Sequence, residues 1–459
     1  MMSIKNAERL RENGSTLKLR RLRGDAIEIL EAALEAADPR RAIESSFKLK
    51  GDHLKIGGHE LILKAYRRIL VIGGGKASGR MAEALEHILG DLIEGGVVIV
   101  PRGIEAALRL RRVKALGASH PFPDAEGVKA VGEMLHLLEE VDEETLILAV
   151  ISGGGSALMT YPAQGVDLEE LREITSKLML AGARINELNA VRKHLSAIKG
   201  GRLAAKAQPA TIVSLILSDV VGDPLDTIAS GPTAPDSTTY SDAVEVLKRY
   251  GLWEEAPPSV KRRLEAGLRG EVDETPKPGD PIFKRVLNVV VANNYTAASA
   301  ALKRAESLGY RGLLLSTRVE GEARVIGGLY AAIAQEIIST GHPLKPPSAI
   351  IAGGETTVTV RGPGRGGRNQ ELALASSLGL RGLDALVASM ATDGVDGPTD
   401  AAGAVADGMT VERAEALGID PLEHLNQNDS YNFFKPLGDL IETGPTGTNV
   451  NDIAVILVR

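Results

Sequence analysis

Short apolar runs alternate with amphipathic segments along most of this chain. Residues 68–72, 146–151 and 211–217 are largely apolar runs of strand length, and the first is followed by Met81, Leu85 and Ile88 at helical spacing. Continuous apolar runs are typical of strands buried on both faces, and strands that alternate with helices predict crossover connections. The pattern therefore predicts an α/β fold with a mostly parallel sheet between two layers of helices.

The alternation is interrupted once, between residues 255 and 283, where prolines and charges gather. Proline ends regular elements, so this stretch predicts a short helix, a linker and a domain boundary. Beyond it we expect strands at 286–291, 312–315, 349–352, 385–390 and 453–458, a hairpin partner at 356–360, and helices at 297–308, 322–338 and 370–378. The expected division is a tail at 1–22, a first α/β domain at 23–255, a linker at 256–285 and a smaller α/β domain at 286–459.

Composition narrows the function classes. The 459 residues carry 53 Lys and Arg against 60 Asp and Glu, a formal net charge of −7, which excludes a generally basic nucleic-acid binder. The absence of cysteine excludes disulfides, thiolate metal sites and a cysteine nucleophile. The 51 glycines beside only 3% aromatic residues indicate tight turns and close approach of the backbone to a ligand.

The apolar runs and the first residues of the sequence indicate where in the cell the protein is expected. No apolar run approaches the roughly 20 residues of a membrane span, so we expect no membrane partner. The first 23 residues are basic but have no apolar core of a signal peptide, and Glu8 and Glu12 disfavour a transit peptide. We expect a solvated N-terminal tail and a cytoplasmic protein, with the oligomeric state open and a homodimer as one option.

Polar or glycine-rich turns follow the predicted strands. In open α/β sheets, ligands bind outside the carboxyl ends of the strands. Turn chemistry alone explains any one of these segments, but not the repeated arrival of Lys, Asp and Glu at them, which favours a ligand site between two domains. The turns begin at Gly73, Ser152, Ser218, Asn293, Gly353 and Thr392.

Two glycine turns in the first half are suited to anions. Residues 73–78 read GGGKAS, and their backbone N–H groups with Lys76 favour phosphate or carboxylate binding. The spacing is neither that of a Walker A loop nor G-x-G-x-x-G, because Ser78 holds the third glycine position. Residues 152–156 read SGGGS, which favours a backbone nest for phosphate; no G-x-S-x-G order or adjacent His indicates a hydrolase. Plain turns are the alternative for both.

Further polar residues have more than one interpretation each. Asn189, Arg192, Lys193, Ser196 and Lys199 share one side of a predicted helix, either as an anion clamp or as a solvated face. Carboxylates in two loops indicate Mg²⁺ binding, proton acceptance or simple turn caps; they are Asp219, Asp223 and Asp226, and then Asp393, Asp396 and Asp400. Residues 362–367 match G-x-G-x-x-G but contain Arg365, and Arg368 follows them, which favours an anion clamp over a dinucleotide turn. The eight histidines show no zinc spacing.

Taken in order, these motifs resemble type II glycerate kinases, the family with a C-terminal MOFRL domain. The resemblance runs from about residue 25 to the C-terminus. No single motif is decisive, but their order and co-occurrence are specific. The segments that carry it are GGGKAS at 73–78, SGGGSA at 152–157, NAVRKHLSAIKGG at 189–201, SDVVGD at 218–223, SGPT at 230–233, RGGRNQE at 365–371 and ATDGVDG at 391–397.

The resemblance implies a Rossmann-like N-terminal domain, a smaller C-terminal domain and an active site in the cleft between them. It implies ATP-dependent phosphorylation of D-glycerate to 2-phosphoglycerate with Mg²⁺, although members differ in the hydroxyl that is phosphorylated. By motif match, Lys76 is the catalytic lysine, Arg368 the anion-binding arginine and Asp393 the catalytic acid. An NAD(P)-dependent hydroxypyruvate reductase and a non-catalytic binding module are the alternatives.

The remaining candidates follow from the same motifs. Asp219 and Asp396 are the candidate metal ligands. The residues expected to bind substrate or phosphate are Gly73, Gly74, Gly75, Ser78, Ser152, Gly153, Gly154, Gly155, Ser156, Asn189, Arg192, Lys199, Asp219, Asn293, Glu355 and Asn369.

Overall fold

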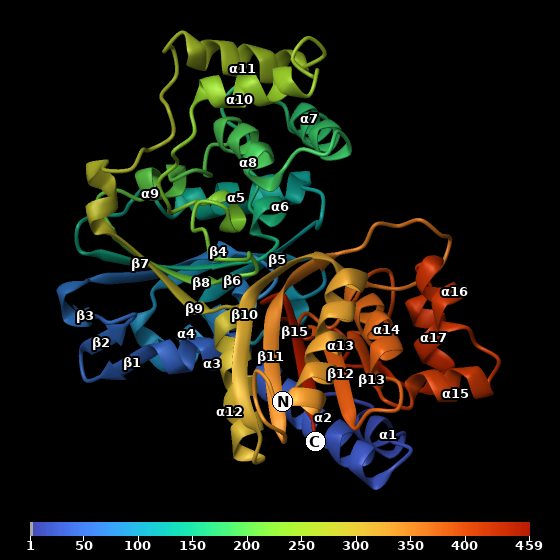
Figure 1. The fold of residues 1–459 in the computed structure, drawn as a ribbon. Helices are drawn as coiled ribbons and strands as arrows, with labels where there is room; N and C mark the ends of the chain where they lie inside the picture. The colour runs from blue at the N-terminus through green and yellow to red at the C-terminus, as the bar shows by residue number, and fades with distance from the viewer. Residues whose placement is uncertain (1–2) are drawn as a thin grey trace. The chain divides into compact units, whose positions relative to one another are not determined.

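The chain folds into two units in the computed structural model, which describes residues 3–459 (Figure 1). We call residues Pro39–Val291 the central unit. The residues up to Asp38, together with Ala292–Arg459, form the terminal unit, so named because it contains both ends of the chain.

The central unit is built on a six-stranded sheet of order β6-β5-β4-β7-β8-β9. The pairs from β6 to β8 are all parallel. Numbered within this sheet alone, the order is 3-2-1-4-5-6, the doubly wound Rossmann arrangement, which confirms the predicted fold. The strands are β4 (Arg68–Gly74), β5 (Gly95–Pro101), β6 (Val113–Ala118), β7 (Thr145–Ser152), β8 (Thr211–Leu217) and β9 (Val286–Ala292).

Helices cover both faces of this sheet. Every residue of β7 is buried, as its continuous apolar sequence predicts. Figure 1 shows α5 and α9 on one side of the sheet and α3 and α4 on the other. The helices of this unit are α3 (Pro39–Ser46), α4 (Ser78–Leu89), α5 (Ala125–His136), α6 (Gly155–Leu158), α7 (Leu168–Leu180), α8 (Ile185–His194), α9 (Arg202–Lys206), α10 (Tyr240–Arg249) and α11 (Pro258–Leu268). A small antiparallel sheet holds β1 (Phe47–Lys50), β2 (His53–Ile56) and β3 (His59–Ile62).

The terminal unit has a mixed six-stranded sheet of order β10-β11-β15-β12-β13-β14. Only β10 and β11 pair in parallel; the other neighbours are antiparallel. Helices α13 and α14 pack on one face, and α2 and α12 on the other. The strands are β10 (Arg311–Glu322), β11 (Ser348–Thr357), β12 (Ala385–Ala391), β13 (Gly403–Asp407), β14 (Leu440–Ile441) and β15 (Asp452–Val458). The helices are α1 (Ala7–Glu12), α2 (Leu17–Ala36), α12 (Asn294–Ser307), α13 (Ala323–Thr340), α14 (Arg368–Leu380), α15 (Thr410–Ala416), α16 (Pro421–Asn426) and α17 (Ser430–Leu437).

The N-terminal segment is not the solvated tail that its basic composition suggested. It forms α1 and α2, and α2 packs against α12 and β15 of the terminal unit. Leu19, Leu22 and Ala26 are fully or almost fully buried at helical spacing. That apolar stripe, rather than the overall charge, decides where the segment lies, because burial of apolar surface stabilises the docked helix.

The expected linker at 256–285 and the start of the second domain at 286 also differ from the structure. Residues 258–268 form α11, whose Val260 and Leu264 are buried in the core with α7, α8 and α10. The next strand, β9, completes the sheet of the central unit, and Asn288 donates a hydrogen bond to Thr233 O in that unit (3.1 Å). Prolines here start α11 and bound its connections without separating two domains.

Two element predictions need smaller corrections. The helix expected to carry both Asn189 and Lys199 ends at His194 in α8, and the chain then turns, so that Ile198 packs in a different core from Leu188. Strand β11 continues to Thr357, so residues 356–360 do not form a separate hairpin strand. Across residues 3–459, no helix combines the length and apolar character that crossing a membrane requires.

Candidate functional site

The two glycine turns of the central unit lie side by side where the strand order reverses. Strands β4 and β7 pair in parallel with Gly73 opposite Val150, so both strands end at the same edge. The Lys76 backbone N–H donates to Gly153 O (2.9 Å), and the Ala77 N–H donates to Ser152 Oγ (3.0 Å). Gly75 has φ +143°, and a Cβ there would lie 2.2 Å from Ser152 Oγ, so only glycine fits this close approach.

The serines of these turns hold the backbone together. Ser78 is fully buried and donates from Oγ to Val150 O (3.1 Å). Ser152, also buried, accepts from Ala77 and lies 3.4 Å from Ser78 Oγ. We expected both to bind phosphate. In this arrangement they fix the shape of the two turns, so we assign them a positioning role.

Lys76 has two polar neighbours at this edge. A Cβ on Gly154 would lie 3.2 Å from Lys76 Cγ and 3.1 Å from His120 Cδ2, so the lysine and the imidazole flank the second turn. Burial, and secondly the charge of Lys76, lower the pKa of His120. Sequence analysis missed His120; its signal is its place two residues after β6, at the carboxyl edge of the same sheet.

Asp219 approaches the second turn from the next strand. Because β7 and β8 are in register with Ser152 opposite Leu217, the residues after β8 reach the glycines after β7. A Cβ on Gly153 would lie 1.9 Å from Asp219 Oδ2, so this carboxylate packs directly on the turn. The structure thus brings together the predicted residues Lys76, Gly153 and Asp219 within one unit.

A polar chain leads from the second turn to α8. The hydroxyls of Ser156 and Ser230 share a hydrogen bond (2.8 Å), and Ser230 Oγ donates to Asn189 Oδ1 (3.0 Å). Lys199 Nζ donates to Ser156 O (2.8 Å) and Met159 O (2.9 Å). Lys199 is 3% exposed; burial, and secondly the nearby Arg192, lower its pKa to about 7.

The other members of the predicted polar face differ in role. Arg192 is half-buried, and burial lowers the pKa of its guanidinium. Lys193 is buried and pairs with Asp226 (3.1 Å) and Asp236 (3.3 Å), so its charge is used inside the fold. Across residues 3–459, no carboxylate lies within ion-pair distance of Lys76, Arg192 or Lys199.

In the terminal unit, Arg368 stands at the start of α14 between two carboxylates. Its Nε and Nη2 donate to Asp452 (2.6 and 3.0 Å), and its Nη1 donates to Glu355 (2.8 Å). The antiparallel register of β11 and β15, with Gly354 opposite Asp452, places both acids beside it. Burial alone would lower the pKa of Arg368, but the bonds to Asp452 and the charge of Glu355 raise it. Sequence analysis missed Asp452, which opens the last strand.

Asp393 and Asp396 leave β12 together but lie in different surroundings. Asp393 is half-buried, its Oδ1 accepts the Val395 N–H (3.1 Å), and its charge contributes to raising the pKa of Glu355, for which burial is the main cause. Asp396 is 1% exposed and accepts the backbone N–H groups of Asn369 (3.1 Å) and Gln370 (2.9 Å) at the start of α14. Burial, and then Asp452, raise its pKa to about 6.

Three of the predicted site residues, Asp396, Asn369 and Asn293, make hydrogen bonds within the fold. Both oxygens of Asp396 serve α14, so we do not assign it to a metal. Asn369 donates to Asp396 and accepts from Ser389 (2.6 Å) inside the fold. Asn293 caps α12 by accepting the Thr296 N–H (3.0 Å). Among residues 3–459, no group of three or more His, Asp or Glu side chains forms a ready metal site.

A large pocket opens beside Arg368 in the terminal unit. Its volume is about 690 Å³. Glu355, Arg368 and the glycine loop at 364–367 line it, with Val358 and Val360 as an apolar wall. The loop that we expected to clamp an anion therefore borders a pocket large enough for a nucleotide.

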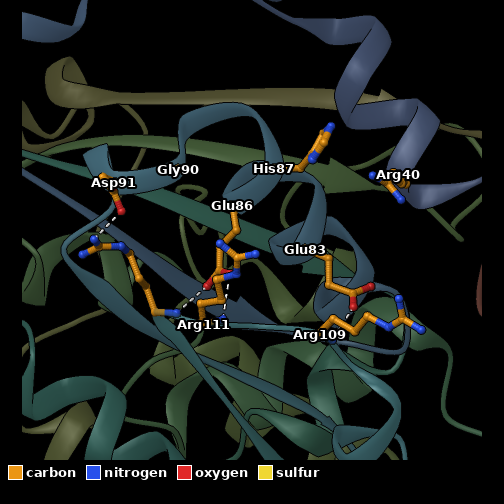
Figure 2. Close-up of a pocket in the computed structure, with 9 residues that line it drawn as sticks. Arg40, Glu83, Glu86, His87, Gly90, Asp91, Arg109 and Arg111 are labelled. Carbon is orange, nitrogen blue, oxygen red and sulfur yellow. Dashed lines mark hydrogen bonds and ion pairs between the residues drawn. The ribbon is translucent and has the colours of Figure 1, made fainter.

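A separate charged pocket in the central unit, shown in Figure 2, has a structural explanation. Glu86 accepts the backbone N–H groups of Arg111 (2.8 Å), Arg112 (2.8 Å) and Val113 (2.7 Å), and Arg112 pairs with Asp91 (2.5 Å). In Figure 2 the side chains spread along the pocket, with Asp91 and Arg40 at opposite ends, rather than converging on one point. Its carboxylates anchor the segment that leads into β6.

The fold and these contacts define a class: a doubly wound α/β protein joined to a second α/β unit. The first unit carries Lys76 on a glycine turn, and the second has an arginine–carboxylate cluster beside a large pocket. Comparisons with known proteins identify the family. A domain described as DUF4147, a domain of unknown function, matches residues 25–265, and the MOFRL family matches residues 348–452.

Three relatives illustrate the similarity. A glycerate 2-kinase from Pyrococcus horikoshii is 42% identical over 95% of this chain and 97% of its own length. The crystal structure of a glycerate kinase from Thermotoga maritima superposes with a TM-score of 0.86 at 41% identity, covering 96% of this chain and 100% of that one. A protein from Agrobacterium vitis named putative hydroxypyruvate reductase is 40% identical over 94% of this chain and 93% of its own length. This chain therefore belongs to the type II glycerate kinase family, and the resemblance noted in its motifs is confirmed.

Proposed function

We propose that this protein is an ATP-dependent glycerate kinase that transfers the γ-phosphoryl group of ATP to a hydroxyl of D-glycerate, forming 2-phosphoglycerate. The observation that carries this proposal is the position of Lys76, which lies between two interlocked glycine turns at the point where the strand order reverses and has no carboxylate within ion-pair distance among residues 3–459. Family membership supplies the reaction type, and this site supplies the groups that phosphoryl transfer requires.

Phosphoryl transfer depends mostly on positioning and on electrostatic stabilisation of the transferring group. In the central unit, the Lys76 ammonium and the backbone amides of the second glycine turn serve as the donors to phosphate oxygens, because the amides of residues 75–78 in the first turn already donate within the fold. Ser78 and Ser152 fix the turns, so the donors are in place before the ligand binds and little reorganisation is needed during the reaction.

In the terminal unit, Arg368 and Asp393 take complementary roles. Arg368 is held rigidly by Asp452, which leaves its contact with the half-exposed Glu355 as the one that an anion would replace. Asp393 uses one oxygen on the Val395 N–H. Its other oxygen is the candidate acceptor of the glycerate hydroxyl proton.

The acidic groups also fit Mg²⁺, which the family implies. Mg²⁺ in kinases is held by one or two carboxylates and by substrate phosphates, so a preformed cage of protein ligands is unnecessary. Asp393 and Glu355 in the terminal unit, and Asp219 in the central unit, have the oxygen chemistry for this. The ion would neutralise phosphate charge. The proposal requires that Lys76 and Asp393 act on the same phosphoryl group when substrates are bound.

The direct test is to incubate the protein with D-glycerate and Mg-ATP and to identify the product by phosphorus NMR. ADP release with formation of 2-phosphoglycerate is the expected result. Formation of 3-phosphoglycerate would correct the regiochemistry and keep the kinase. Binding of D-glycerate without ADP release would contradict the proposed enzymatic activity and favour a binding module.

A cytoplasmic location is part of this proposal, because the reaction consumes ATP.

A hydroxypyruvate reductase is the second candidate, because the Agrobacterium vitis relative carries that name and the sheet order is that of dinucleotide-binding domains. In the first glycine turn, however, the third glycine of a dinucleotide fingerprint is replaced by Ser78, which is buried against Val150. Incubation with hydroxypyruvate and NADH or NADPH decides between them: loss of the reduced nicotinamide absorbance would favour the reductase, and a stable absorbance the kinase.

A further inference from the structure

A small cavity in the central unit has an unusual balance of charge. Its volume is about 110 Å³, and its lining includes Phe122, Ser156, Arg172, Met179, Arg192 and Lys199. Three of its lining side chains are cationic, and none is a carboxylate. The large pocket of the terminal unit, by contrast, includes three glutamates in its lining.

Among residues 3–459, two of the three cations have no anionic partner within ion-pair distance. Arg172, on α7, pairs with Glu169 through both of its oxygens (2.8 and 2.9 Å). Lys199 donates only to main-chain carbonyls, and no hydrogen-bond partner of the Arg192 side chain is found among residues 3–459. Partly or fully buried cations without a counter-charge are costly, and here burial lowers the pKa of both groups. An anionic ligand would supply the missing partner.

We propose that this cavity binds the carboxylate of the acceptor acid, with Arg192 as its main donor and Lys199 as the second positive charge. The inference rests on the proposed function, because it assigns a subsite within the same reaction. Pockets for drug-sized ligands have volumes of roughly 300–1,000 Å³. A cavity of about 110 Å³ therefore suits a short hydroxy acid of a few carbon atoms and excludes a nucleotide, which the larger pocket of the terminal unit can accommodate.

The cavity and Lys76 are connected through the second glycine turn. Ser156 lines the cavity, and Gly154, two residues earlier, packs against Lys76 and His120. Phe122, which forms part of the apolar wall, follows His120 by two residues. An acid whose carboxylate enters this cavity directs its hydroxyl groups towards that turn. The cavity thus selects acids over alcohols and sets which end of the acceptor faces Lys76.

The first experiment compares Arg192→Gln with Lys177→Gln. Lys177 lies on α7, outside the cavity lining, and pairs with Glu173 (2.7 Å), which makes it a matched loss of one cation. We expect Arg192→Gln to raise KM for D-glycerate about 10- to 100-fold, the range for a hydrogen bond to a charged group, with KM for ATP unchanged. The Lys177→Gln variant should match the wild type in both constants.

Several results would overturn the assignment. An unchanged KM for D-glycerate in folded Arg192→Gln would remove the carboxylate from this cavity, and a raised KM for ATP would assign the cavity to nucleotide phosphates. If the wild type turns over no glycerate, the proposed function fails. Even then, calorimetry tests the cavity independently of turnover: binding of D-glycerate to the wild type, and its loss in Arg192→Gln, would support the carboxylate site.

A second measurement uses the protonation of Lys199. The charged groups that face it are Arg192 on α8 and Arg172 on α7; the cavity lining adds no acid. Since its pKa is about 7, much of Lys199 is neutral at pH 8, and a bound carboxylate favours the charged form. Calorimetry of D-glycerate binding at pH 8 in Tris and in HEPES should therefore show net proton uptake.

Two variants identify the source of that proton. Lys199→Met should lose the uptake, and His120→Asn should retain it, which distinguishes Lys199 from the nearby imidazole. Equal heats in both buffers for the wild type, or uptake that is lost in His120→Asn and kept in Lys199→Met, would contradict the role of Lys199.

Discussion

Selected cations of the two units differ in their partners, although the central unit also contains the paired Lys193. In the terminal unit, Arg23 and Arg368 are each held by two carboxylates: Arg23, 0% exposed, by Asp407 and Asp439, and Arg368 by Asp452 and Glu355. In the central unit, Lys76, Arg192 and Lys199 have no carboxylate within ion-pair distance among residues 3–459.

This difference separates charges that hold the fold from charges that await a ligand. A buried ion pair satisfies its own electrostatics, so that removing one partner leaves an uncompensated charge. A cation without a partner, on a rigid glycine turn or in a small cavity, gains most when an anion binds. Arg368 lies between the two cases, because it is rigidly held and yet borders an open pocket.

The largest effect is expected for the acid beside the arginine cluster. Asp393→Asn should lower kcat by up to about 10⁴-fold, the upper range for a positioned proton acceptor, because the amide cannot take the hydroxyl proton. Steady-state kinetics and circular dichroism check activity and fold together. Asp400 lies in the same loop and accepts a hydrogen bond from the Tyr431 hydroxyl (2.7 Å). The Asp400→Asn variant is therefore the matched control, and we expect it to have near-normal turnover. Retained activity in Asp393→Asn would move the role to Asp219.

Substitution of Arg23, a structural arginine of the terminal unit, should lower stability rather than activity. Arg23→Met leaves Asp407 and Asp439 buried, although Arg413 still pairs with Asp439 (2.8 Å). We expect the free energy of unfolding to fall by about 3–5 kcal/mol. Urea unfolding, followed by hydrogen exchange of the α2 amides, measures this. Adding Asp407→Asn should recover part of the loss; a further loss of equal size would argue against an uncompensated charge as the cause.

Substitution of Lys76 tests the cations that have no carboxylate partner among residues 3–459. Lys76→Ala should lower kcat about 10²- to 10³-fold, by about 3–4 kcal/mol in activation free energy, as expected when one preorganised donor is removed. Stability should change little, because no ion pair is lost. Lys114→Ala, which removes an exposed lysine paired with Glu133 (2.5 Å), provides the control for kinetics and melting temperature. Near-normal turnover in Lys76→Ala would take this lysine out of the chemistry.

The smallest expected effect is a shift in titration. The charge of Lys76 is the second cause, after burial, that lowers the pKa of His120. Replacing Lys76 by Met should therefore raise the pKa of His120, while burial keeps it below its ordinary value. Proton NMR of the His120 ring across pH 5–8 measures the change. An unshifted titration would show that the two side chains do not interact.

Much of the architecture could be predicted from the sequence because it depends on local pattern. The continuous apolar run of β7 predicts a strand buried on both faces, and the polar turns after β4, β7, β8 and β12 predict the edge at which ligands bind. Lys76 and Asp393 follow such strands directly, so their positions within each unit required no knowledge of distant contacts. The family resemblance added the reaction.

The tertiary structure decided what depends on partners distant in the chain. Asp452 meets Arg368 only through the register of β11 and β15, and Arg23 is structural only because α2 packs near Asp407 and Asp439. His120, the lining of the Arg192 cavity and the capping role of Asp396 likewise follow from folding. The sequence determined which groups can carry charge, whereas the fold determined which of those charges are already compensated, because compensation depends on distance and burial rather than on residue type.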